Sequence, residues 1–79
     1  MYTLINTMNH IGGDSIGIVV SNHRTQEAAE YAELRLAAAV KQVNGNGSYI
    51  PTRIVRLSER HATGKHVHPL YVIHDTIET

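Results

Sequence analysis

The chain has 79 residues, of which seven Lys and Arg balance seven Asp and Glu, and it contains no cysteine. Its length allows one domain, residues 1–79, with a small core to which burial against a partner would add stability. The balanced charge argues against a protein whose main task is to wrap nucleic acid or lie on anionic lipid, and the lack of cysteine excludes disulfides and thiolate metal sites.

The first two predicted elements are strands. Tyr2 to Met8 carries apolar residues in a strand-like pattern and ends at the turn-rich stretch from Asn9 to Ser15. Ile16 to Ser21 is short and β-branched, as in a buried strand, so the two predict a hairpin with a long loop. This N-terminal region has neither a basic segment nor a long apolar stretch, so we expect a cytoplasmic protein with no membrane partner.

A helix is predicted from Thr25 to Asn44, with Thr25 as its cap and Gly45 as its stop. At helical spacing, seven apolar residues share an arc of about 120° that should pack on the sheet; these are Ala28, Ala29, Ala32, Leu36, Ala39, Val40 and Val43. A second stripe, Tyr31, Leu34 and Ala38, lies off this arc. It is either ordinary exposed surface or a contact with a partner or a second copy.

Two more strands are predicted after the helix. Tyr49 to Leu57 is β-prone, and Pro51 indicates that this strand begins there or lies at an edge. Ser58 to Lys65 reads as a polar connection, and Val67 to Ile77 as a strand with apolar residues on both faces, suited to a central position or a subunit interface. The expected fold is therefore α+β: a four-stranded antiparallel sheet with one helix on a face, in the order ββαββ.

The histidines raise the alternative of a metal site. On an ideal strand His66 and His68 share a face and could present two imidazoles to one metal ion. Pro69 interrupts that strand, and His74 would lie some 20 Å further along an extended chain. We therefore expect no metal and no other cofactor, and keep His66 and His68 as the alternative.

Four of the seven formal positive charges lie close together in the sequence, at Arg53, Arg56, Arg60 and Lys65. Such a group could bind phosphates or an acidic protein surface, for which arginine offers bidentate contacts. The alternative is a solvated edge strand whose charges prevent aggregation.

The sequence carries no signature of catalysis. It has no nucleophile elbow around a serine and no phosphate-binding loop opening a helix. The acids Glu27, Glu30 and Glu33 suit the solvated N-terminal half of a helix better than a catalytic pair. We expect a protein that is not an enzyme.

In size, in its lack of a catalytic signature and in its ββαββ plan, the chain resembles the small accessory proteins of phages and mobile elements, among them anti-CRISPR inhibitors. The resemblance implies an inhibitor that blocks a larger host complex, such as a nucleoprotein complex. We predict a non-enzymatic protein-binding module whose contact residues are Arg53, Arg56, Arg60, Lys65, Tyr31 and Leu34. A small nucleic-acid-binding regulator and a histidine-based metal-binding protein are the alternatives, and homodimerisation through the Tyr31 stripe or an edge strand is compatible with each.

Overall fold

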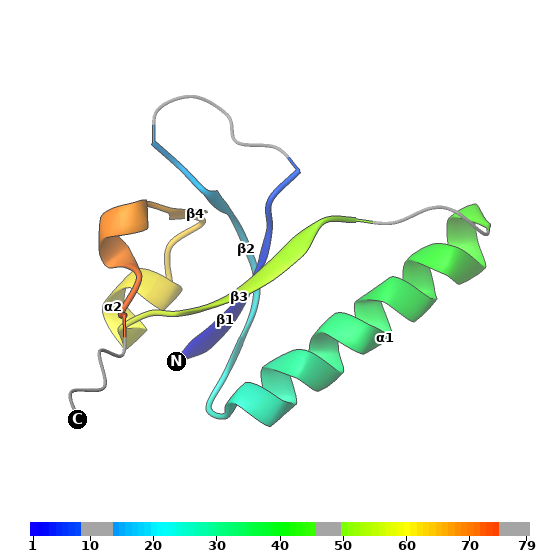
Figure 1. Ribbon diagram of the computed structural model, residues 1–79, viewed down its shortest axis with the longest axis horizontal. Coiled ribbons are helices and arrows are strands. Elements are labelled where there is room, and N and C mark those ends of the chain that lie inside the picture. Colours follow the sequence, from blue (N-terminus) through cyan, green and yellow to red (C-terminus); the bar gives the residue numbers. More distant parts are fainter. Residues whose placement is uncertain (9–13, 46–49, 75–79) are drawn as a thin grey trace.

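The computed structural model describes residues 1–8, 14–45 and 50–74. Its elements in chain order are β1 (Tyr2–Asn6), β2 (Gly17–His23), α1 (Gln26–Asn44), β3 (Thr52–Arg56), α2 (Glu59–Ala62), β4 (His66–Val67) and the 3-10 turn η1 (Pro69–Tyr71). The strands form one antiparallel sheet in the order β3-β1-β2-β4 (Figure 1). The predicted α+β fold is thus confirmed. Within the described ranges, no helix has the length and apolar character to cross a membrane.

The central strand β1 defines the two faces of the sheet. In an antiparallel pair, residues opposite each other point to the same side. Ile5 lies opposite Arg53, and Leu4 lies opposite Ile54. We call the side that carries Thr3, Ile5, Arg53 and Val55 the Ile5 face, and the side that carries Tyr2, Leu4, Thr52, Ile54 and Arg56 the Leu4 face.

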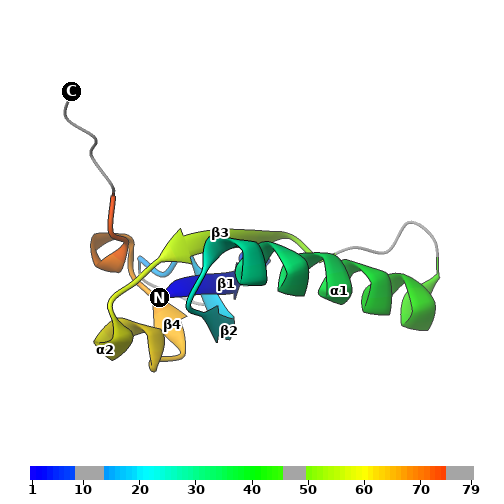
Figure 2. The ribbon, with the colours of Figure 1, turned by 90° about the horizontal axis from the view of Figure 1, so that it is seen from below.

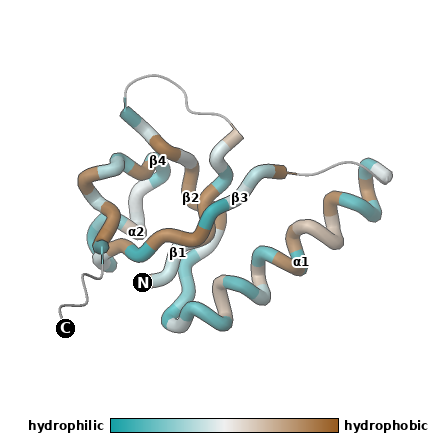
Figure 3. Tube along the Cα trace, viewed as in Figure 1, coloured by the Kyte–Doolittle hydropathy of each residue, from teal (hydrophilic) through white to brown (hydrophobic). Residues whose placement is uncertain are grey.

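The main core lies on the Ile5 face. Ile5 and Val55 form a buried cluster with Leu57, Ala62 from α2 and Val67 from β4. Figure 3 shows hydrophobic stretches along β2 and β3, interrupted by hydrophilic residues, whereas α1 alternates between hydrophilic and hydrophobic residues along its length. α2 and the segment after it therefore cover one face of the sheet and leave the other for α1.

α1 has the predicted ends. The Thr25 side chain accepts a hydrogen bond from the backbone of Ala28, and Gly45 closes the helix with a φ of 88°, a conformation that favours glycine. Thr52 belongs to the Leu4 face and donates a hydrogen bond to Glu33 of α1. This contact places α1 on the Leu4 face.

The predicted apolar arc of α1 is only partly covered. Ala29 and Val40 are buried, but Ala28 and Ala39 are exposed, and Val43 is 81% exposed. The reason is length: the 19 residues of α1 span about 28 Å, whereas the five residues of β3 span about 17 Å. Figures 1 and 2 show the C-terminal half of α1 extending beyond the strands. The prediction that the whole arc packs on the sheet was wrong.

The prediction of a last strand from Val67 to Ile77 was also wrong. β4 ends at Val67, and the chain turns into η1, where the His68 ring accepts a hydrogen bond from the backbone of Leu70 at 3.1 Å. Pro69 favours this turn because its φ is preset and it has no N–H to contribute to a ladder. Ile77 lies outside the described residues.

One other segment differs from expectation. The predicted polar connection from Ser58 to Lys65 contains α2, for which the Ser58 side chain accepts a hydrogen bond from the backbone of His61. β3 begins at Thr52, directly after Pro51, as expected for an edge strand. Tyr49, where the strand was predicted to begin, lies outside the described residues.

Candidate binding surface at the β3 edge

β3 is an edge strand, and its backbone shows which residues face outward. Leu57 N–H donates to Met1 at 2.8 Å and Thr7 N–H donates to the Pro51 carbonyl at 3.0 Å, so the odd-numbered positions point toward β1. The even-numbered positions, Thr52, Ile54 and Arg56, therefore direct their backbone groups away from the sheet.

Part of this outer edge is already occupied. Ile73 N–H, from the extended segment after η1, donates to the Arg56 carbonyl at 2.8 Å. Within the described residues, the backbone groups of Thr52 and Ile54 have no hydrogen-bond partner. An edge with unpaired N–H and C=O groups is a template for a further strand.

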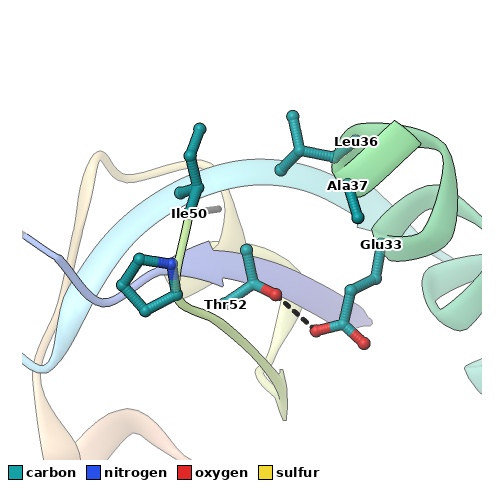
Figure 4. Close-up of a pocket in the computed structure, with 6 residues that line it drawn as sticks. Glu33, Leu36, Ala37, Ile50 and Thr52 are labelled. Carbon is teal, nitrogen blue, oxygen red and sulfur yellow. Dashed lines mark hydrogen bonds between the residues drawn. The ribbon is translucent and has the colours of Figure 1, made fainter. Parts of the chain in front are cut away.

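A cleft of about 280 Å³ lies between α1 and the start of β3 (Figure 4). Thr52 Oγ1 donates to Glu33 Oε2 at 2.5 Å inside it. The remaining walls are apolar and come from both elements: Leu36, Ala37, Ile50 and Pro51. The cleft is smaller than the common range for cofactors and drug-sized ligands, so it suits a single apolar side chain of a partner.

The structure does not bring the four predicted basic residues together. Arg53 is exposed on the Ile5 face, while Arg56 lies on the Leu4 face, with its guanidinium 5.6 Å from the centre of the Tyr2 ring. Alternation along the strand makes this separation unavoidable. Arg60 is exposed on α2, and Lys65 lies at the other edge of the sheet, where its carbonyl accepts from Val19. Only Arg53 is both exposed and on β3.

Tyr31 and Leu34 lie on the outer side of α1, 63% and 69% exposed. The Arg35 guanidinium lies 5.8 Å from the centre of the Tyr31 ring. Helical spacing places both Tyr31 and Leu34 well away from the buried Ala29, although Leu34 is only about 60° from Ala37 in the wall of the cleft. They belong to a different surface from Arg53.

The histidines do not gather around a metal position. His66 is exposed on β4, whereas both ring nitrogens of His68 have neighbours: Nδ1 accepts from Leu70, and Nε2 lies 3.4 Å from an Asp14 carboxylate oxygen. Within the described ranges there is no group of three or more His, Cys, Asp or Glu side chains that could hold a metal ion.

Sequence reasoning missed the cleft and the aromatic contacts around η1. The cleft depends on how far α1 lies from Ile50 and Pro51, which no local pattern encodes. Tyr71 stacks on His61 and lies 5.6 Å from the His68 ring. The sequence signal that could have indicated the η1 turn, which brings these rings together, is Pro69. Pro51, by contrast, correctly indicated the edge strand.

Comparison of the chain with protein-family models, curated proteins and solved structures found no match.

Proposed function

We propose that this chain is a non-enzymatic protein-binding module that holds its partner at the outer edge of β3. One observation carries the proposal: the backbone groups of Thr52 and Ile54 have no hydrogen-bond partner among the described residues, and Thr52 also lines a cleft with mostly apolar walls. Strand edges of this kind bind extended segments through backbone hydrogen bonds, and adjacent pockets select the side chains. The exposed Arg53 adds a charge that can select among partners.

The same geometry favours a protein over a nucleic acid. Binding a phosphate backbone requires several positive side chains along one surface. Here Arg53 and Arg56 lie on opposite faces, and Lys65 lies at the far edge of the sheet. A nucleic-acid-binding regulator therefore stays the second candidate.

We further propose that the partner belongs to a larger host complex, which the module blocks in the cytoplasm. The small size and the ββαββ plan, which resemble those of phage and mobile-element inhibitors, support this part of the proposal. A chain of 79 residues can act simply by covering a surface that another protein needs.

Affinity capture from lysate of the native host tests the proposal, with and without nuclease. The variant Ala37→Trp fills the cleft from an exposed helix position, and Ala38→Trp is its matched control on the next residue. We expect a stoichiometric protein complex that survives nuclease, is lost with Ala37→Trp and persists with Ala38→Trp.

Two results would overturn the proposal. Capture that disappears with nuclease would indicate nucleic-acid binding, whose affinity should fall steeply with salt. Loss of the partner with Ala38→Trp but not with Ala37→Trp would move the contact to the Tyr31 stripe.

A further inference from the structure

We infer that the partner contributes an extended, acidic segment that adds to the outer edge of β3 as a new strand. This inference rests on the proposed function and specifies the chemistry of the partner. Its acidic side chains lie on the Ile5 face, beside Arg53, and its apolar side chains lie on the Leu4 face, beside the cleft.

The backbone groups of β3 set the length of the segment. Thr52 and Ile54 each direct one N–H and one C=O outward, and these groups are unpaired within the described residues. At the other end of the strand, Ile73 already donates to Arg56 in the way an added strand would. The partner segment therefore pairs with Thr52 to Ile54 and stops before Arg56. About five residues centred opposite Arg53 reach from Pro51 to Val55 and fit this space.

The two faces of β3 set the side chains of the segment. On the Ile5 face, Arg53 is exposed, and its guanidinium forms no ion pair with the residues described. An acidic residue opposite it gains a favourable cross-strand pair. On the Leu4 face, the cleft has apolar walls and the Glu33 carboxylate, which repels an acid. The partner thus alternates acidic and apolar residues.

The charge of Arg53 also argues against a second copy of this chain as the occupant. Antiparallel pairing of two β3 strands about Ile54 would place Arg53 opposite Val55 of the other copy. The two Arg53 side chains would then be diagonal neighbours on one face, about 7–8 Å apart. Because like charges at this distance repel, an acidic segment of another protein fits the edge better than β3 itself.

The test uses a synthetic peptide of alternating Asp and Val, about five residues long, with a Lys–Val peptide as its matched control. Binding is followed by amide NMR and hydrogen exchange on the full chain. We expect the Asp–Val peptide to slow exchange of the Thr52 and Ile54 amides by about tenfold or more. The amides of Arg53 and Val55, which point toward β1, should not change.

Two protein variants sharpen the test. Chemical synthesis with N-methyl-Ile54 removes the outward donor and keeps the side chain, and should abolish peptide binding. Arg53→Glu should weaken binding by about tenfold, whereas Arg24→Glu, at an exposed arginine before α1, should leave it unchanged. Amide spectra of each variant show that the fold persists.

Four outcomes would overturn the inference. The first two are that the Asp–Val peptide does not bind at millimolar concentration, or that the Lys–Val peptide binds equally well. The third is that the peptide binds without slowing exchange of the Thr52 and Ile54 amides. The fourth is that the peptide binds only after residues 75–79 are removed. The last would identify the end of this chain as the occupant. If a host protein sensitive to Ala37→Trp binds N-methyl-Ile54 protein normally, strand addition is wrong, and a protein-binding module that contacts its partner through the cleft remains.

Discussion

His61 in α2 and Tyr71 at the end of η1 stack face to face, with ring centroids 3.8 Å apart and ring planes at 7° to each other. The contact joins two elements that are short and have little regular hydrogen bonding of their own. It holds η1 beside α2, and η1 leads directly to Ile73, which occupies the end of the β3 edge.

We expect the stacked rings to be energetically coupled. In a double-mutant cycle of His61→Ala and Tyr71→Ala, the coupling energy should be about 1 kcal/mol. Urea denaturation of the four proteins measures it. Leu70→Ala, at an 85% exposed neighbour, should change stability little. Strictly additive effects of the two substitutions would show that the stack contributes nothing.

The hydrogen bond from Thr52 to Glu33 joins β3 to α1 across the cleft. Thr52→Val removes the donor and keeps the shape of the side chain, so we expect a loss of about 1 kcal/mol in unfolding free energy. Thr52→Ser retains the hydroxyl and should lose less. If both variants unfold at the same denaturant concentration, the hydroxyl does not hold the helix.

Gly17 lies where β2 passes close to the end of β1. A Cβ at this position would lie 2.9 Å from the Asn6 carbonyl oxygen and 3.0 Å from Ile5 Cδ1. Gly17→Ala should therefore destabilise the protein by about 1–3 kcal/mol through overpacking. At Gly64 the nearest atom would be 3.4 Å away, so Gly64→Ala is a matched control with little effect. Equal melting temperatures for the two variants would contradict this prediction.

Val40 and Val43 lie on the same predicted arc of α1 but in different environments, at 8% and 81% exposure. Val40→Ala should cost about 2 kcal/mol because it removes buried methyl groups, whereas Val43→Ala should stay within about 0.5 kcal/mol. Thermal unfolding at equal protein concentration checks both. A large loss for Val43→Ala that shrinks on dilution would instead reveal a partner subunit on this end of the helix.

The elements with local signals were predictable from sequence. Thr25 and Gly45 define α1 because capping and left-handed glycine are local chemistry, and Pro51 correctly indicated the edge strand. β1 and β2 followed from apolar runs bounded by turn residues, although β2 continues to His23, two residues past its predicted end at Ser21.

The predictions that were wrong concern features that depend on distant parts of the chain. Val43 has the right helical angle for the core, but none of the described strands reaches it, and helix periodicity holds no information about the length of the sheet. Arg53 and Arg56 are close in sequence yet lie on opposite faces, a consequence of strand alternation that a count of charges ignores. The candidate site was therefore predicted only in part, through Arg53 and the edge position of β3.

The central position of β1 has a consequence for how the chain folds. We expect β1 to pair early with β2, its neighbour in the chain. The other side of β1 can pair only after β3 is available, because Tyr2 lies opposite Arg56. That second pairing closes a long loop, which costs entropy before any hydrogen bond forms, so we expect it to limit the folding rate. On the ribosome, the β1–β2 hairpin would expose a bare strand until β3 emerges, and the open flank of β1 is where nascent chains would first aggregate.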